Sequence, residues 1–369
     1  MLPASLLGWL VIRGSFFSLV MASLAADREL FSVGQMNILA RELALPEHFP
    51  HALGCCLEWE TRREVLLKNM YDLRDSSGNH VDILCLEELS DYWEFFKDAL
   101  AASPLNMNSV YVKRPSITHT SWSGLTKTDG CGIFYSKEKF QLVMQHSVNF
   151  LDPHDRVGLI VLLQRLAPEG EAPRYLLVAN THLYWDIRKE EVQLAELQHL
   201  HTEVEALLLR AETELGTERS SIPVIVAGDF NNVPNSSVYR YMLESFLPDT
   251  HSMRSAYSDY RRPPGQVDSE LEGAYEPPVT SVTYRRAHTI DYIWYSAGLQ
   301  TTFLHPLPSE EALRSEDGPP HWKEKVVDTQ IQWEDSCNYN GLPNSQWGSD
   351  HIPLMASFTT ALASPRSVE

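Results

Sequence analysis

The chain alternates short apolar runs with amphipathic stretches, and this alternation constrains its fold more than any other feature. Apolar runs such as VDILCLEEL and IPVIVAGDF are rich in Val, Ile and Leu and have the length of buried strands. The stretches between such runs, for example TRREVLLKNMYDL and Lys189 to Leu215, repeat apolar residues at helical spacing. This mixture predicts an α/β fold: a four-layer sandwich of two mixed sheets packed face to face, with helices outside.

Further runs extend the same pattern along the chain. The expected strands are FSVGQMNIL, GCGIFYS, VGLIVLLQRL, YLLVANTHLYW, HTIDYIWYS and HIPLMASF, and the expected helices are DYWEFFKDAL and SSVYRYMLESFL, with Ser236 as its cap. Two stretches, Pro263–Pro278 and Glu310–Tyr339, are charged and contain proline, so we expect loops there. Because neither loop separates two independent cores, we expect one domain over residues 30–362 and a tail at 363–369.

Composition limits how this chain can bind nucleic acid. Of its 369 residues 43% are hydrophobic, which suits a globular core, and the net charge is −19. A chain this acidic does not attract nucleic acid over its whole surface, so RNA would bind locally, in a cleft and with a metal ion. Neither a disulfide framework nor a zinc site is expected, because the cysteines are odd in number and have no CxxC or Cys/His spacing; they are Cys55, Cys56, Cys85, Cys131 and Cys337.

The first 29 residues form an apolar segment with two open interpretations. Leu6 to Ala26 is mostly apolar, is interrupted by Arg13, and has no acid before Asp27. The segment either targets the protein, to a mitochondrion or as a signal anchor, or lies upstream of a true start at Met21. Reduced thiols favour an intracellular location, in the first instance cytoplasmic. No other stretch is long and apolar enough to span a membrane, so no membrane partner is expected.

Polar side chains stand at the ends of the apolar strands. We predict that five strands each carry one at the C-terminal end and that a further pair precedes the last strand; the residues are Asn37, Glu88, His182, Asp229 with Asn231, Asp291, and the pair Asp350 and His351. Rigid strand ends hold side chains in place, as catalysis requires. Converging carboxylates repel one another unless a cation lies among them, and oxygen donors favour Mg²⁺ or Mn²⁺ over zinc. Carboxylates and histidines around such an ion are typical of metal-assisted hydrolysis of phosphate esters.

Four motifs in order carry a resemblance to a known family. NTHLYWD, IPVIVAGDFNNVPNS, TIDYIWYS and GLPNSQWGSDHIPL together resemble the endonuclease/exonuclease/phosphatase superfamily. Within it the chain is similar to the carbon-catabolite-repression deadenylase branch, which also includes nocturnin, the 2′,5′-phosphodiesterases and the Angel proteins. The resemblance runs from Phe31 to Phe358, and it implies a DNase I-like fold and a metal-dependent hydrolase.

The resemblance also implies roles for the metal-binding residues. Glu88 corresponds to the family's metal-binding glutamate, and Asn37 to the asparagine that supports the metal site. Asp350 corresponds to the acid beside the metal. Because Glu87 stands where the family usually has Gln, which of the two adjacent acids leads is left open.

The remaining matched residues correspond to the groups that act on water and phosphate. Asp229 matches the carboxylate that orients and deprotonates the attacking water. Asn231 matches the amide that holds the phosphate, and His182 the histidine that contacts it. Asp291 and His351 match a carboxylate–imidazole pair, in which the carboxylate keeps the imidazole cationic near a developing negative charge.

One segment departs from the deadenylase pattern. In TSVTYRRAHTIDY, Ser281, Arg286 and His288 replace an asparagine, an aromatic and a glycine of the deadenylases, and Ile187 stands where these often have Pro. Without the base-stacking aromatic, selection of adenine is not expected. The guanidinium of Arg286 favours phosphate oxygens over a base, so Arg286 is a candidate substrate contact. EPPVTS, SAYSDY and GDFNNVPNSSVY are more similar to the Angel proteins.

These features together predict a Mg²⁺- or Mn²⁺-dependent RNA phosphohydrolase. The Angel resemblance implies hydrolysis of 2′,3′-cyclic phosphates at RNA 3′ ends. Three other activities stay open: 3′ exonuclease action on poly(A), hydrolysis of 2′,5′ linkages, and removal of phosphate from a dinucleotide. A non-catalytic RNA-binding adaptor is the alternative from another class, and it would be expected to lack Glu88, Asp229 or His351. RNA is the expected partner, and protein partners are not predicted.

Overall fold

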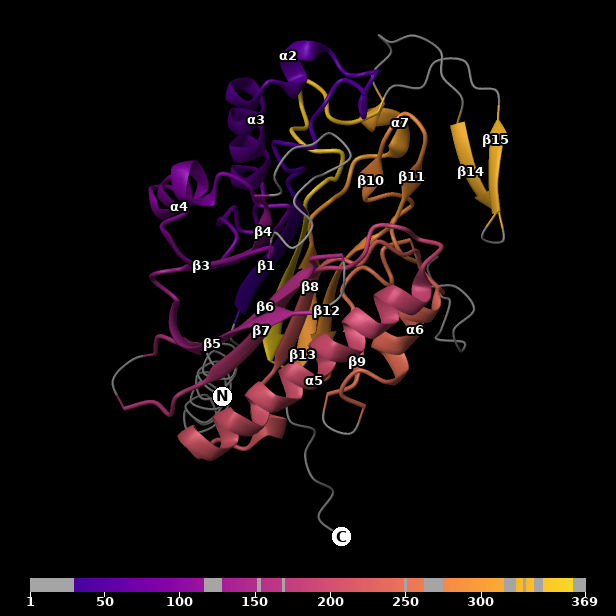
Figure 1. Ribbon diagram of the computed structural model, residues 1–369. Coiled ribbons are helices and arrows are strands. Elements are labelled where there is room, and N and C mark those ends of the chain that lie inside the picture. Colours follow the sequence, from indigo (N-terminus) through magenta and orange to yellow (C-terminus); the bar gives the residue numbers. More distant parts are fainter. Residues whose placement is uncertain are drawn as a thin grey trace, which may run out of the picture.

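The computed structural model describes most of the chain (Figure 1). It covers residues 30–115, 128–150, 154–167, 170–248, 251–261, 275–314, 323–327, 330–334 and 341–360. The apolar segment 1–29, the tail 363–369, Cys337 and most of the Pro263–Pro278 loop lie outside these residues. Within them, no helix combines the length and the apolar character that crossing a membrane requires. The four cysteines in this part of the chain are free thiols.

Two six-stranded sheets form the centre of the molecule. The first has the order β13 (Leu299–Leu304), β16 (Leu354–Thr360), β1 (Leu30–Asn37), β2 (Ile83–Glu87), β4 (Gly130–Ser136) and β3 (Met107–Lys113). The second has the order β5 (Phe140–Asn149), β6 (Val157–Arg165), β7 (Tyr175–His182), β8 (Val224–Asp229), β12 (Asp291–Ser296) and β9 (Met253–Ser255). Both sheets are mixed, because β1 is parallel to β2 and antiparallel to β16, while β7 is parallel to β8 and antiparallel to β6.

Helices cover the outer face of each sheet, which completes four layers (Figure 1). The long α5 (Glu190–Leu215) and the short α6 (Ser237–Glu244) pack on the second sheet. The first sheet is covered by α3 (Trp59–Tyr71), the π-helical turn η1 (Tyr92–Phe96) and α4 (Lys97–Ala101). Shorter helices are α2 (Gly54–Leu57), η2 (Arg219–Ser221) and α7 (Glu310–Leu313). The predicted α/β sandwich, DNase I-like in form, is confirmed.

Buried apolar side chains form one core between the sheets and one under each helical layer. Ile83, Val178 and Ile293 are fully buried between the two sheets. Strands with apolar residues on both faces explain why their sequences are nearly continuous apolar runs. The predicted cap of α6 is also confirmed: the side chain of Ser236 accepts a hydrogen bond from Tyr239 N at the start of this helix.

The second predicted loop is wrong in part. The stretch 310–339 contains α7 and a two-stranded hairpin, β14 (Lys323–Val327) with β15 (Gln330–Glu334). Strand β5 was also not recognised in the sequence. It forms an edge of its sheet, and most of its residues are exposed, so it has no continuous apolar run to mark it.

Strand ends meet at one edge of the sandwich, and they place the candidate site. Strands β1, β2, β7 and β8 finish there, which confirms the expected position of the polar groups that end them. Asp291 differs, since it is the first residue of β12 and not the last. Because β12 runs antiparallel to β8, its beginning lies opposite the end of β8, and Asp291 pairs with Asp229. The prediction that Asp291 ends its strand is therefore wrong, although its location at this edge is right.

Candidate active site

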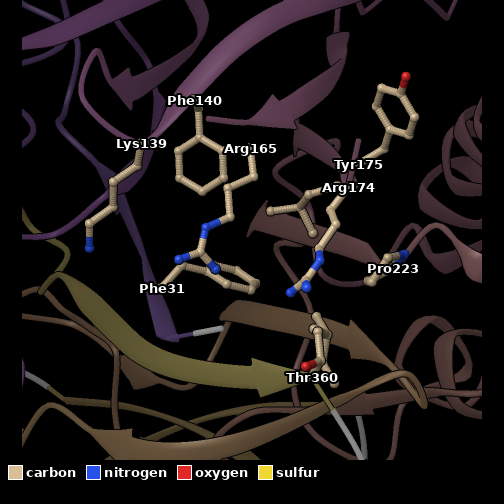
Figure 2. A pocket seen from close by; sticks show the side chains of 10 residues that line it. Phe31, Lys139, Phe140, Arg165, Arg174, Tyr175, Pro223 and Thr360 are labelled. Carbon is tan, nitrogen blue, oxygen red and sulfur yellow. The ribbon is translucent and has the colours of Figure 1, made fainter. Parts of the chain in front are cut away.

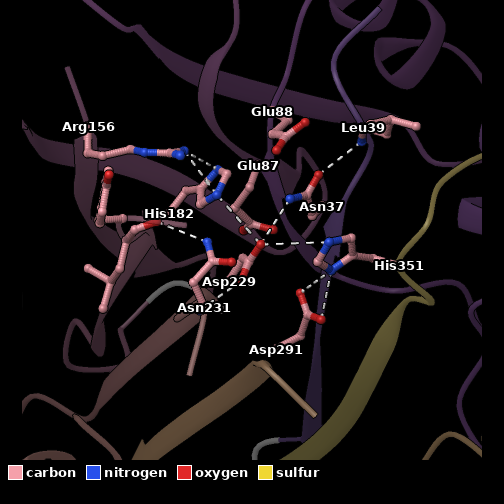
Figure 3. Close-up of polar contacts among 12 residues, drawn as sticks. Asn37, Leu39, Glu87, Glu88, Arg156, His182, Asp229, Asn231, Asp291 and His351 are labelled. Carbon is pink, nitrogen blue, oxygen red and sulfur yellow. Dashed lines mark hydrogen bonds and ion pairs between the residues drawn. The ribbon is translucent and has the colours of Figure 1, made fainter. Parts of the chain in front are cut away.

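Asp229 lies at the centre of the polar cluster in Figure 3. It follows Gly228, whose φ is +147° and whose position would bring an added Cβ to 1.9 Å from the carbonyl oxygen of Thr181. Only glycine fits there, so β8 approaches β7 closely and Asp229 is in register with His182. Asn37 Nδ2 donates to Oδ2 of Asp229 at 3.0 Å, and the backbone N–H of Asn231 donates to Oδ1 at 2.9 Å.

The surroundings of Asp229 change the protonation of its carboxylate. Burial raises its pKa to about 7, and the neighbouring carboxylate of Asp291 adds to the rise. A base whose pKa is close to the working pH is effective in proton transfer. Two imidazoles face it: Nε2 of His182 lies 3.6 Å from Oδ2 and Nε2 of His351 lies 3.8 Å from the same oxygen.

Asp291 and His351 form a buried ion pair. Nδ1 of His351 lies 2.9 Å from Oδ2 of Asp291, and Thr280 Oγ1 and Gln35 Nε2 donate to the same carboxylate at 2.6 and 3.0 Å. Burial lowers the pKa of His351, but the carboxylates around it, Asp291 first, outweigh burial and raise this pKa well above its usual value. The carboxylates around His351 therefore favour its protonated form.

His182 has the opposite surroundings. Nη1 of Arg156 lies 3.1 Å from Nδ1 and 3.0 Å from Nε2 of its ring. Burial lowers the pKa of His182 well below its usual value, and the charges of Arg156 and Arg114 lower it further. Burial and the neighbouring guanidinium thus favour the neutral form of His182.

Glu88 faces a second group of charges. Its backbone has φ +50°, so the chain leaves β2 by a left-handed turn that non-glycine residues rarely adopt. Oε2 accepts a hydrogen bond from Ala40 N at 2.9 Å. Burial raises the pKa of Glu88, and the carboxylates of Asp129 and Asp350 raise it further. Repulsion of this kind is relieved when a cation binds among the acids.

The adjacent acid, Glu87, points elsewhere. It is fully buried, accepts a hydrogen bond from Gln35 Nε2 at 2.7 Å, and its other oxygen, Oε1, is buried without a partner. Burial raises its pKa well above the usual value, and the charge of Asp291 raises it further. Burial thus favours the protonated form of Glu87 inside the sandwich, where Gln would make similar contacts.

Two arrangements of side chains can be weighed as a metal site. Asp229, Asp291 and His351 each offer an atom, and these atoms all lie within 4.8 Å of one another. However, Nδ1 of His351 lies 2.9 Å from Asp291, and the raised pKa of the ring favours its protonated form, which does not bind metal. Glu88 and Asp350 offer oxygen donors that repel each other, which fits a hard divalent cation better.

The other predicted residues lie around this centre. Oδ1 of Asn37 accepts a hydrogen bond from Leu39 N, so its carbonyl is already partly engaged. Nδ2 of Asn231 donates to the carbonyl of Leu183. Arg286 lies in the hairpin formed by β10 (Ser281–Val282) and β11 (Ala287–His288). The first residue of β10, Ser281, forms a β-bridge to His351.

Three residues that contact predicted site residues directly were missed in the sequence; they are Gln35, Arg156 and Thr280. Thr280 and Gln35 bind the carboxylate of Asp291, and Arg156 binds His182. Gln35 precedes the predicted strand-end group by two residues and therefore shares its face of the strand, which is a usable signal. Arg156 precedes a strand and is in no recognised motif.

Comparison with known proteins identifies the family. A sequence model of the Endonuclease/Exonuclease/phosphatase family matches residues 56–351. The chain belongs to this family. Its members are nucleases and phosphatases, so the chain is a hydrolase, and the resemblance drawn from the GDFNN and SDH motifs is confirmed. The matched segment includes Glu88, Asp229 and His351.

Several curated relatives of this endonuclease/exonuclease/phosphatase chain match most of its length. Nocturnin of Xenopus laevis is 28% identical, over 94% of this chain and 77% of the relative. Protein angel homolog 2 of Danio rerio is 27% identical, over 89% of this chain and 64% of the relative. CCR4-NOT transcription complex subunit 6-like of Danio rerio is 25% identical, over 89% of this chain. The chain spans 62% of that last protein's length.

Solved structures confirm the fold. The structure of ANGEL2, a 2′,3′-cyclic phosphatase, in complex with adenosine-2′,3′-vanadate has 25% identity and a TM-score of 0.66, and it covers 91% of this chain and 97% of that one. The catalytic domain of human nocturnin with bound sulfate has 24% identity and a TM-score of 0.59, covers 90% of this chain and 98% of that one, and supports the fold.

Proposed function

We propose that this chain hydrolyses 2′,3′-cyclic phosphates at RNA 3′ ends with the help of Mg²⁺ or Mn²⁺. The observation that carries the proposal is the likeness to ANGEL2 with its adenosine-2′,3′-vanadate, over 91% of this chain. The arrangement around Asp229 agrees with it, since it combines a base, an imidazolium and a guanidinium within one buried cluster.

In this reaction Asp229 accepts a proton from water. The water oxygen attacks phosphorus, the bond from phosphorus to one ribose oxygen breaks, and that oxygen takes up a proton to give a phosphomonoester. Asn37 and the backbone of Asn231 hold the carboxylate in place through hydrogen bonds of 3.0 and 2.9 Å. His351, fixed by Asp291, places positive charge beside the water and the phosphate oxygens.

The metal is proposed to bind at Glu88, with Asp350 and Asn37 nearby. When bound, such an ion withdraws negative charge from the phosphate oxygens. The residues fit, because Glu88 offers an oxygen donor whose charge is repelled by Asp350 and Asp129. Arg62 Nη1 holds this region together by donating to the carbonyls of Ile38 and Gly348 at 2.8 and 3.0 Å.

A cavity beside Glu88 is large enough for nucleotides of the RNA. It has a volume of about 590 Å³ and is lined by Arg41, Tyr111 and Lys113 among others. The cavity adjoins the site: the backbone N–H of Ala40 donates to Glu88, and the residue after Ala40, Arg41, lines the cavity. Trp93 on its wall is 64% exposed, and an exposed aromatic ring can stack on a base. By contrast, the cavity in Figure 2 holds about 20 Å³, roughly one water molecule, between the opposite strand ends.

A second candidate function is 3′ exonuclease action on poly(A). It is favoured by relatives named as CCR4-Not complex 3′-5′-exoribonuclease subunits, one of which, from Mycosarcoma maydis, is 26% identical over 90% of this chain. In the hairpin beside His351, neither neighbour of Arg286 is an aromatic residue that could stack on adenine. The nearby ring of Tyr284 lies under the guanidinium of Arg285. We therefore propose the cyclic phosphate, and not poly(A), as the first substrate.

A substrate panel with the purified protein separates these activities. It contains an oligonucleotide with a 2′,3′-cyclic phosphate end, an A-tailed one of equal length, a 2′,5′-linked oligoadenylate and a dinucleotide 2′-phosphate, each with Mg²⁺ and with EDTA. The proposal expects the cyclic phosphate to be opened fastest. A clear preference for the A-tail would replace it with the deadenylase function, and no turnover of any substrate would favour an adaptor.

A further inference from the structure

Arg156 is a buried cation at the His182 side of the site (Figure 3). It immediately precedes β6, and only 7% of its surface is exposed. Nη1 lies within 3.1 Å of both ring nitrogens of His182. The imidazole of His182 therefore lies between the guanidinium and Asp229, whose Oδ2 is 3.6 Å from Nε2 of this ring.

Arg156 forms no direct ion pair with a carboxylate in the part of the chain that the structure describes. Its side-chain hydrogen bonds there go to His182, and its Nε is buried without a hydrogen-bond partner. Three carboxylates act on its charge from beyond ion-pair distance; they are Asp129, Glu196 and Glu88. Arg114 is buried to the same extent but forms an ion pair with Asp129 at 3.2 Å. Buried charges are normally paired, because an unpaired one loses hydration without compensation. Arg156 thus lacks the direct ion pair that Arg114 has.

The loop that carries Arg156 is fixed in place. Arg114 Nε donates to the carbonyl of Asp155 at 3.0 Å, and its Nη2 donates to the carbonyl of His154 at 3.0 Å. Asp155 has a left-handed backbone, with φ +60°. A cation held this rigidly next to the reacting groups is preorganised for an anion.

We propose that Arg156 binds a non-bridging oxygen of the phosphate under attack, so that a guanidinium neutralises this side of the phosphate and His182 does not. This inference rests on the proposed phosphate-ester substrate. His182, which lies within 3.1 Å of Nη1 of Arg156, orients the guanidinium and the water near Asp229. A guanidinium suits the task because its several N–H groups form a planar fork that matches phosphate oxygens.

Binding of inorganic phosphate tests the proposal without turnover. Isothermal titration calorimetry compares the full chain with Arg156→Gln, Arg156→Lys and the control Arg240→Gln, an exposed arginine on α6, in Mg²⁺ and again in EDTA. We expect Arg156→Gln to weaken phosphate binding about tenfold or more, Arg156→Lys to weaken it less, and Arg240→Gln to leave it unchanged. Thermal unfolding of each variant establishes that it is folded.

Equal phosphate binding by the wild type and a folded Arg156→Gln variant, no binding by either included, overturns the proposal. If Arg156→Gln does not fold, Arg156→Lys decides: weaker phosphate binding supports the proposal, and unchanged binding overturns it. Failure of the proposed function is a separate result. It would be seen as no opening of the cyclic phosphate by a wild-type chain that still binds phosphate through Arg156.

Discussion

The two histidines that face Asp229 lie in opposite electrostatic surroundings. His351 contacts a carboxylate, at 2.9 Å from Asp291, and its pKa is raised well above its usual value. His182 contacts a guanidinium, at 3.0 Å from Arg156, and burial with this charge lowers its pKa well below the usual value. Both rings are buried to the same degree, so burial does not distinguish them.

The difference shows that the neighbour of a buried histidine sets its charge. Desolvation disfavours the imidazolium at both positions, and only a nearby carboxylate reverses it. Positive charge on the two sides of Asp229 therefore comes from different groups: from the imidazolium of His351 on one side and from the guanidinium of Arg156 on the other.

Removing the metal tests whether His351 and Arg156 provide enough positive charge for turnover without it. We expect EDTA to abolish turnover and Mg²⁺ or Mn²⁺ to restore it, because the acids near Glu88 need a cation between them. Glu88→Gln should lose at least about 100-fold in rate, since a metal contributes several kcal/mol to such reactions. The adjacent Glu87→Gln is the matched comparison and should stay active, because Glu87 is a neutral acid bound to Gln35.

Full activity in EDTA would contradict the metal-dependent mechanism. A Glu87→Gln variant that loses activity while Glu88→Gln keeps it would reverse the assignment of the two acids. Binding of Mn²⁺, followed by calorimetry in both variants, checks the same assignment without turnover.

Replacing the group between the histidines should have the next largest effect. Asp229→Asn removes the base and should lower kcat about 10³-fold. Asp72→Asn, with a side chain 58% exposed, is the control and should be unchanged. The melting temperature of Asp229→Asn should not fall, because burial disfavours the charge that is removed. A rate within tenfold of the wild type would exclude Asp229 as the base.

The pH profile of the wild type follows from the same residue. A base works only when ionised, so kcat should fall about tenfold per pH unit below the pKa of Asp229. In the metal-free chain this pKa is raised to about 7, and a bound cation would lower it, so the inflection should lie at or below about 7. Asp229→Asn should lack this limb, and a wild-type profile that rises towards low pH would contradict the assignment.

Arg286 tests whether the positive surface extends beyond Arg156. We expect Arg286→Gln to raise KM for an RNA substrate a few-fold with kcat unchanged, as loss of a partly exposed phosphate contact would do. Arg254→Gln, on the exposed face of β9, is the control. An unchanged KM would make Arg286 a surface residue only.

Much of the site could be predicted because its residues end or begin apolar strands. Asn37, His182 and Asp229 each complete a run whose burial is evident from its composition. Asp291 shows the limit of this reasoning: its run was recognised, but strand direction depends on the partner strand, which local sequence does not contain.

Arg156 could not be found from the sequence, because nothing local distinguishes it from a surface arginine. Its burial and its contact with His182 arise because β6 pairs with β7, which brings Arg156 next to a residue 26 positions later in the chain. Edge strand β5 and the hairpin of β14 and β15 were missed for a related reason, since pairing rather than composition defines them. Sequence thus indicated polar groups that the fold brings together, and tertiary contacts shift their pKa values.

The most direct test of the divided site is an NMR titration of its two histidines. Their ring signals, assigned with His182→Gln and His351→Gln variants, are followed between about pH 5.5 and 8.5, where an ordinary histidine titrates. The account predicts that His351 stays protonated and His182 stays neutral throughout this range. It also predicts that Asp291→Asn lowers the pKa of His351 and that Arg156→Gln raises the pKa of His182. Two histidines that both titrate near their usual value in the wild type would contradict it.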